Sequence, residues 1–299
     1  MQTETIGTMT IDRVGEIDRY RFKPQDFLQG LDDAMVERYK PLLGPRLIDF
    51  ATNALIISFH GYVIRAPRLT IVVDTCNGDD KHRPGKPWQH MQTGCHYLDN
   101  LANLGVRPED VDVVLCTHLH GDHVGWNTRL REGRWVPTFP NARYLIARRE
   151  FEHFSKLTEG PPGSPQPYPA FADSILPVIE AGRVEWVEMH QSIHHHLDDS
   201  IWLEPAAGHT PGHVTVHVKG RGASAVLSGD VIHHPIQFHE PQLSNNGDLD
   251  PAQALASRTR LLQDCAGTRA VLLTGHFPAP TAGFVTAIGD RFEFRYKGD

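Results

Sequence analysis

The sequence predicts an α/β fold of one large domain, and three observations support this prediction. Short runs rich in valine, isoleucine and leucine recur along the chain, each bounded by glycine, proline or polar residues, as buried strands are. Segments suited to helices, such as residues 94–104, 148–156 and 251–265, lie between these runs. For the last of these, Asp250 is the expected N-cap, with Pro251 in the first turn. With 299 residues, of which 40% are hydrophobic, the chain is long enough to bury a full core.

The elements near the amino terminus are expected to precede the main body of the fold. Residues 9–14 are a strand candidate, and residues 31–39 are a helix candidate that Pro41 is expected to end. We interpret residues 1–50 as an N-terminal extension. Short apolar runs in residues 54–74 then predict a meander of strands that leads to Asp74.

The densest group of metal-competent side chains follows a strand predicted at residues 111–116. Within six residues the chain places His118, His120, Asp122 and His123. In an extended loop the first two histidines point the same way, so they can hold one ion together. The glycine that follows bends the backbone and turns the other two side chains toward a second point. The pattern therefore indicates two metal ions.

Three further predicted strands adjoin side chains of the same kind. A turn with the sequence Gly-His-Thr-Pro-Gly-His contains His209 and His213 and precedes a strand at residues 214–218. Asp230 follows the apolar run 225–227, and His276 follows the run 270–273. Placement at strand ends is how a rigid scaffold presents a metal site.

This ordered set of motifs resembles the metallo-β-lactamase-fold hydrolase superfamily, in its lactonase and methyl-parathion-hydrolase-like branch, over roughly residues 53–276. The resemblance implies a four-layered αββα sandwich with two divalent metal ions. It also implies the ligands: for the first ion His118, His120 and His213, for the second Asp122, His123 and His276, and as a bridge Asp230. Within the turn it favours His213 over His209. By the same resemblance, Asp74 braces residues 117–123, here called the metal loop, without binding an ion.

Imidazole and carboxylate ligands suit zinc, manganese or iron, and zinc is the first expectation. Water held between two divalent ions ionises near neutral pH, since one zinc alone lowers its pKa to about 7. The resulting hydroxide can attack a carbonyl or phosphoryl group, with Asp122 orienting it and carrying a proton to the leaving oxygen. In lactonase members a tyrosine three residues after the bridging aspartate contacts substrate; here that position holds His233, a second candidate catalytic residue. Whether His233 touches substrate stays open.

The resemblance implies hydrolysis of a small, fairly apolar ester or lactone, with acyl-homoserine lactones first. A phosphotriesterase, a hydrolytic dehalogenase and a β-lactamase are alternatives within hydrolysis. A di-iron redox protein and a non-catalytic binding module represent other classes. No flavodoxin-like segment follows His276, and all seven ligand positions are filled, so both are disfavoured.

Charge and sequence patterns limit the kinds of partner that we expect for this protein. The net charge of -7 and the lack of a lysine- or arginine-rich run argue against nucleic acid. The sequence shows neither a signal peptide nor an apolar stretch of 18 residues, which predicts a cytoplasmic enzyme without membrane contact. A homodimer is a family expectation. The four cysteines lack C-x-x-C spacing and are interpreted as reduced thiols.

Two polar loops and several other side chains complete the predictions. Residues 76–94 are interpreted as a loop over the site, and residues 160–169 are too rich in proline for a helix or a sheet interior. For both loops a lid and a dimer contact stay open. The remaining histidines of interest are expected in solvated loops: His82, His90 and residues 194–196. Trp126 and Phe238 are candidates for an apolar pocket, with core packing the alternative for Phe238.

Overall fold

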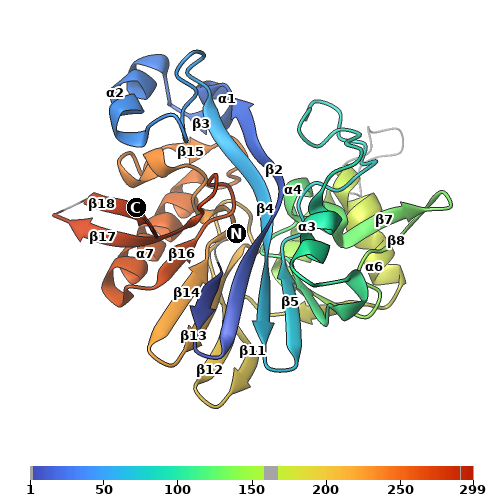
Figure 1. Cartoon of the computed structure of the whole chain (residues 1–299). Helices are drawn as coiled ribbons and strands as arrows, with labels where there is room; N and C mark the ends of the chain where they lie inside the picture. Colours follow the sequence, from blue (N-terminus) through green and yellow to red (C-terminus); the bar gives the residue numbers. More distant parts are fainter. Residues whose placement is uncertain (1–2, 158–167, 290, 299) are drawn as a thin grey trace. The chain divides into compact units, whose positions relative to one another are not determined.

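The computed structural model of the chain describes residues 3–157, 168–289 and 291–298. It contains two compact units, each built around a seven-stranded sheet (Figure 1). The first unit comprises the residues up to Ile17 together with Phe59–Gln191. The second comprises Asp18–Ser58 together with the chain from Ser192 onward. The α/β fold class predicted from the sequence is confirmed.

The first unit's sheet has the strand order β1-β2-β4-β5-β6-β9-β10. In chain order its strands are β1 (Glu4–Ile6), β2 (Met9–Phe22), β4 (Leu55–Ala66), β5 (Leu69–Val73), β6 (Val113–Leu115), β9 (Arg143–Ala147) and β10 (Val184–Val187). The first fifty residues thus supply two strands of this sheet, and β2 is longer than the predicted strand at residues 9–14.

Strands β5, β6, β9 and β10 run parallel. Val73 pairs with Leu115, and Leu115 pairs with Leu145, so these strands end at one edge of the sheet. All three residues of β6 are buried, as expected for a parallel strand covered on both faces. The polar residues that follow β5 and β6 are consequently neighbours.

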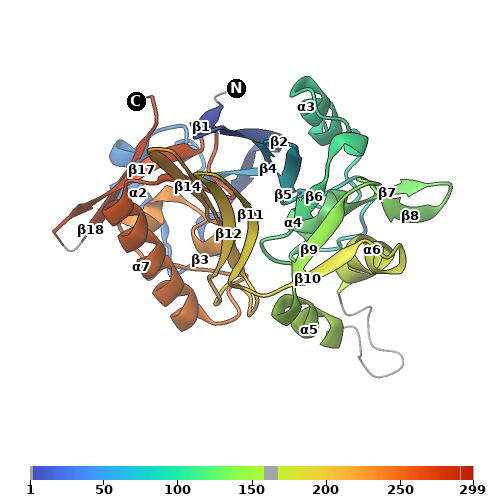
Figure 2. The same cartoon turned by 90° about the horizontal axis from the view of Figure 1, so that it is seen from below.

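Helices cover the parallel strands, and Figure 2 shows α5 and α6 beside β9 and β10. The helices are α3 (Tyr97–Asn103), α5 (Arg148–Lys156) and α6 (Leu176–Glu180). Their side chains form one buried core with strand residues such as Val114 and Ile146. Shorter elements complete the unit: η1 (Pro108–Asp110), α4 (Gly121–Val124), η2 (Gly125–Asn127), β7 (Thr128–Arg131), β8 (Arg134–Pro137) and the π-helix η3 (Phe171–Ile175).

The second unit's sheet has the strand order β11-β12-β13-β14-β16-β17-β18. In chain order its strands are β11 (Gln191–His196), β12 (Asp199–Pro205), β13 (Val214–Gly220), β14 (Ala223–Leu227), β16 (Val271–Leu273), β17 (Ala282–Ile288) and β18 (Arg291–Tyr296). Strands β14 and β16 are parallel, with Leu227 opposite Leu273. The residues after these two strands therefore meet, as in the first unit.

Helix α7 (Pro251–Thr268) lies against this sheet (Figure 2). Its residues Leu261, Leu262 and Cys265 belong to the core of the second unit. The Asp250 carboxylate caps its first turn by accepting from the Gln253 N–H at 3.0 Å, and Pro251 occupies the first turn, as predicted. The helix ends three residues later than predicted.

Smaller elements of the second unit are α1 (Pro24–Phe27), β3 (Leu28–Gln29), α2 (Asp33–Leu43), η4 (Gly229–Val231), η5 (Pro235–Phe238) and β15 (Ser244–Asn245), which pairs with β3. The prediction that Pro41 ends the helix is wrong, because α2 continues to Leu43. Proline removes one helical hydrogen bond near the end, and the helix then closes with the Gly44 N–H on the Lys40 carbonyl at 2.9 Å.

Other predictions have mixed outcomes. Residues 76–94, all within the described part, form neither helix nor strand, as predicted. His194, His195 and His196 lie in strand β11, so their placement in a loop is wrong. Most of residues 160–169 falls outside the described residues.

The four cysteines, all described, carry free thiols. Among the described residues, no helix combines the length and apolar character needed to cross a bilayer.

Candidate metal centre

In the first unit the ends of β5 and β6 place Asp74 beside Thr117. The Thr117 N–H and hydroxyl each donate a hydrogen bond of 2.8 Å to the Asp74 carboxylate. Asp74 has a positive φ of 56°, and its carbonyl approaches Gly61 so closely that a Cβ there would lie 2.1 Å from the oxygen. Asp74 therefore braces the start of the metal loop, as the sequence predicted.

The same carboxylate orients a candidate ligand. Nδ1 of His123 donates to Oδ2 of Asp74 at 2.9 Å, which leaves Nε2 as the nitrogen available to a metal. Nδ1 of His118 lies 3.1 Å from the Thr117 hydroxyl, whose proton already goes to Asp74, so this imidazole donates as well. Both histidines are buried. Their tautomers are thus set by the protein itself.

The loop brings its four predicted ligands together. The ring centroid of His118 lies 4.8 Å from that of His120 and 4.1 Å from that of His123. Asp122 is half-buried in the first turn of α4, and its Oδ2 lies 3.9 Å from Nε2 of His123. This unit therefore presents three imidazoles and one carboxylate at the carboxyl end of β6.

In the second unit the ends of β14 and β16 place Asp230 beside His276. Nε2 of His276 lies 3.1 Å from Oδ1 of Asp230. Its Nδ1 donates to the Ser58 carbonyl at 3.0 Å, which again fixes the tautomer with Nε2 facing the carboxylate. Gly275 has no Cβ to obstruct this contact; one there would lie 3.0 Å from Oδ1 of Asp230.

His209 also faces Asp230. Its Nδ1 donates to Oδ1 of Asp248 at 2.7 Å, and its Nε2 lies 3.2 Å from Oδ2 of Asp230. Burial lowers the pKa of His209, but hydrogen bonds to the two aspartates outweigh burial and raise the pKa to about 9. The same negative surroundings favour a divalent cation. A carboxylate behind an imidazole is a common arrangement of metal-binding histidines.

Two polar groups hold Asp248 in place. Its Oδ2 accepts from the Ser244 hydroxyl at 2.7 Å and lies 3.6 Å from Nη2 of Arg258 on α7. The guanidinium of Arg258 also donates to three backbone carbonyls, those of Val231, Pro241 and Leu243. Arg258 is buried and joins the helix to the segment after Asp230.

His213 plays a different part from the one expected. Its Nε2 accepts a hydrogen bond of 2.9 Å from the backbone N–H of Asp230. This nitrogen is therefore engaged by the backbone, and the geometry favours His209 as the ligand, the reverse of the sequence-based preference. Both histidines lie in one turn, and the partner that distinguishes them, Asp248, is 39 residues away from His209. No local signal separates them.

His233 is buried among candidate ligands. Its Nε2 lies 3.2 Å from Oδ2 of Asp230, and its ring stacks on His276 with centroids 5.6 Å apart. Burial lowers the pKa of His233 to about 4, so the imidazole is neutral at neutral pH. Within this unit, Asp230, His233 and His276 place ligand atoms within 4.8 Å of one another, as do His209, His233 and Asp248.

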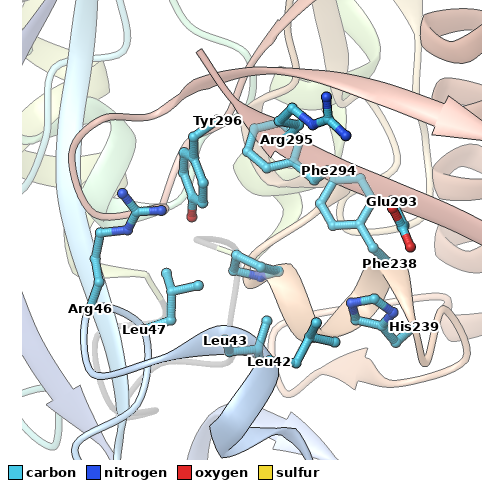
Figure 3. A pocket seen from close by; sticks show the side chains of 11 residues that line it. Leu42, Leu43, Arg46, Leu47, Phe238, His239, Glu293, Phe294, Arg295 and Tyr296 are labelled. Atoms are coloured by element: carbon cyan, nitrogen blue, oxygen red, sulfur yellow. The ribbon is translucent and has the colours of Figure 1, made fainter. Parts of the chain in front are cut away.

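Other predicted residues have structural roles. His90 accepts from the Arg83 N–H through Nδ1 at 3.0 Å, and its ring lies against that of His82. Trp126 is buried and donates to Glu16 at 2.7 Å. Phe238 packs in the second unit's core and also lines a hollow of about 270 Å³ (Figure 3). In that hollow, Arg46 lies over the ring of Tyr296.

The donor set fits divalent transition metals. Each unit presents buried imidazoles whose Nδ1 atoms are held by protein groups, together with a carboxylate close to Nε2. Nitrogen and oxygen ligands of this kind bind zinc, manganese and iron. The protein orients these donors through partners behind them, and such partners tune metal affinity.

Comparison with known proteins agrees with these features. Ribonuclease TTHA0252 of Thermus thermophilus is 33% identical over 143 residues, which cover 47% of this chain and 31% of the ribonuclease. N-acyl homoserine lactonase AiiB of Agrobacterium fabrum is 28% identical over 103 residues, or 31% of this chain and 35% of AiiB. The chain thus spans about a third of the length of these relatives.

The structure of AidC, a dizinc quorum-quenching lactonase, superimposes with a TM-score of 0.75 at 20% identity, covering 100% of this chain and 97% of AidC. This likeness confirms the predicted fold. The sequence model of the Metallo-beta-lactamase superfamily matches residues 60–276, which is most of the chain. The chain therefore belongs to the metallo-beta-lactamase superfamily.

Proposed function

We propose that this protein is a dinuclear metal-dependent hydrolase of small esters or lactones. One observation carries the proposal: buried histidines in the segments that follow strands are held through Nδ1, so that Nε2 is the nitrogen each can offer to a metal ion. His123, His209 and His276 show this arrangement with three different acceptors. Holding an imidazole in this way requires a buried polar partner for its Nδ1. A metal-binding role for Nε2 explains why the protein places such partners in its interior.

We propose seven ligands for two ions: His118, His120, Asp122, His123, His209, Asp230 and His276. His209 replaces His213 because Nε2 of His213 accepts from the Asp230 N–H. Asp230 is the proposed bridge, since imidazoles of His209 and His276 both lie near its carboxylate. Zinc is the proposed metal; AidC, described as dizinc, supports it.

Two divalent ions supply Lewis acidity and ionise water near neutral pH. The chain's own residues are proposed to handle the protons and the substrate. Asp122 is half-buried and suited to carry a proton to the leaving oxygen. His233, neutral and next to Asp230, is proposed to donate a hydrogen bond to the substrate.

Small neutral substrates suit the chain better than nucleic acid. The net charge of -7 would repel a polyanion, and the similar ribonuclease matches over only 31% of its length. Lactones are the first expectation because AiiB and AidC are both described as lactonases. Acyl-homoserine lactones are the specific substrates proposed.

A substrate panel with metal analysis tests the proposal. The purified protein would be assayed on acyl-homoserine lactones, aryl esters, phosphotriesters and β-lactams, while elemental analysis counts zinc, manganese and iron. We expect lactone hydrolysis that a chelator abolishes and added metal restores. Asp230→Ala should lose metal and activity together. A fully metallated protein that hydrolyses none of the panel would refute the proposal.

A further inference from the structure

We propose that Gln89 is a positioning residue that fixes the carboxylate of Asp122. Its side-chain Nε2 donates to Oδ1 of Asp122 at 3.2 Å. The inference rests on the proposed function, in which Asp122 binds a metal ion and carries a proton. With Oδ1 held by the amide, Oδ2 is the oxygen directed toward the imidazole of His123.

The contact is built into the metal loop by a glycine. Gln89 is 1% exposed, and its Oε1 packs against Gly121, where an added Cβ would lie only 2.8 Å from that oxygen. Any larger residue at position 121 would displace the amide. Oε1 has no hydrogen-bond partner among the described residues, so the donor end sets the orientation. A flipped amide would place its oxygen against the carboxylate of Asp122, which is repulsive.

The segment that carries Gln89 is anchored by a buried ion pair. Arg83 donates two hydrogen bonds to Asp173, of 2.6 and 2.7 Å. Paired guanidinium and carboxylate groups of this geometry are strong and directional. Asp173 belongs to η3, so the pair connects the loop to the helical layer of the same unit.

The buried amino group of Lys81 adds to this anchor. Nζ of Lys81 donates to the Thr128 hydroxyl at 2.7 Å and to the Asp173 carbonyl at 3.2 Å, and it lies 3.5 Å from the centre of the Trp135 ring. The base of the loop is closed by the Met91 N–H, which donates to the Lys81 carbonyl at 2.7 Å. Residues 81–91, here called the anchored segment, are therefore held firmly beside the metal loop.

The anchored segment also bounds a cavity of about 250 Å³. Its lining includes Arg83, Gln89, Gly121 and Tyr168. Gln89 thus lines this cavity and also donates to Asp122, which is not among the lining residues. Loss of its amide would free Asp122 to rotate toward the cavity, away from the position it needs at the metal centre.

Two substitutions test the inference. Gln89→Glu keeps the shape and removes the donor, and Gln89→Leu removes the amide. Gln92→Leu is the matched control, because Gln92 lies in the same loop and its amide donates, among the described residues, to two backbone carbonyls. The readouts are affinity for each of two zinc ions by chelator competition, the visible spectrum of the cobalt-substituted protein, and kcat and KM for a lactone.

We expect both Gln89 variants to bind one of the two ions about 10- to 100-fold more weakly, the usual cost of losing a group that orients a ligand. The cobalt spectrum should change and kcat should fall while KM stays close to wild type. Gln92→Leu should match wild type. Thermal unfolding of the metal-free proteins checks that the variants fold; if Gln89→Leu does not, the isosteric Gln89→Glu decides.

Wild-type affinity and an unaltered cobalt spectrum in Gln89→Glu would overturn the inference. Equal losses in Gln89→Leu and Gln92→Leu would also overturn it, since they would indicate a general effect on the loop. A wild-type protein that binds two ions but hydrolyses nothing would refute the proposed function alone. The metal-affinity and cobalt measurements would still decide the role of Gln89.

Discussion

Nδ1 of His123 lies 2.9 Å from Oδ2 of Asp74, and both side chains are buried in the first unit. The aspartate comes from the end of β5 and the histidine from α4, beyond the end of β6. Parallel pairing of the two strands is what brings them together. The sheet therefore determines which nitrogen of the imidazole can bind a metal.

Replacing Asp74 with asparagine should weaken metal binding by about 10- to 100-fold, because one acceptor for His123 or Thr117 becomes a donor. Chelator competition would measure this loss. Asp112→Asn is the control, since Asp112 is exposed and accepts from the Thr70 N–H at 2.8 Å away from the metal loop. Wild-type metal affinity in Asp74→Asn would contradict the bracing role.

The two histidines of the 208–213 turn should respond differently to alanine. His209→Ala should lower the metal content measured by elemental analysis. His213→Ala should keep the metal but reduce the free energy of unfolding by about 1 to 3 kcal/mol, because the buried N–H of Asp230 loses its acceptor. The opposite ranking of metal contents would restore His213 as the ligand.

Gly208→Ala should destabilise the second unit. Gly208 has a φ of 135°, and a Cβ there would lie 2.2 Å from the backbone nitrogen of Ala254. We expect the free energy of unfolding in urea to fall by about 2 to 4 kcal/mol. Gly267→Ala in α7 is the matched control; it meets open space and should raise stability by about 0.5 to 1 kcal/mol. Equal stabilities of the two variants would argue against the close packing at Gly208.

Lys81 should make stability depend on pH. Burial lowers its pKa to about 7, whereas the unfolded lysine keeps a value near 10.5. Between pH 7 and 9 the unfolded chain therefore binds more protons at this site, so the free energy of unfolding should rise with pH by up to about 1.4 kcal/mol per unit. Denaturant titrations at several pH values should show a smaller rise in Lys81→Met. Parallel profiles would show that Lys81 is charged throughout this range.

Much of this architecture could be predicted because the candidate metal ligands follow strands that can be recognised in the sequence. Short apolar runs located β6, β14 and β16, and the polar residues that follow β14 and β16 supplied Asp230 and His276. The capping residue and proline at the start of α7 predicted that helix, with its end off by three residues. Each of these features depends on neighbours in the sequence.

The rest depends on contacts between distant residues. The choice between His209 and His213 depends on Asp248, and the role of Gln89 depends on its approach to Gly121. Periodicity could not show that β1 and β2 join the sheet, because pairing partners are chosen in three dimensions. Pro41 is tolerated inside α2 because only two residues of the helix follow it, so the lost hydrogen bond costs little there.

Arg258 holds the carbonyls of Val231 and Leu243 at the two ends of one segment, together with the carboxylate behind His209. Replacing Arg258 would release both ends of this segment and the carboxylate behind His209 at the same time. A single inward-facing arginine thereby links helix α7 to the orientation of a candidate ligand.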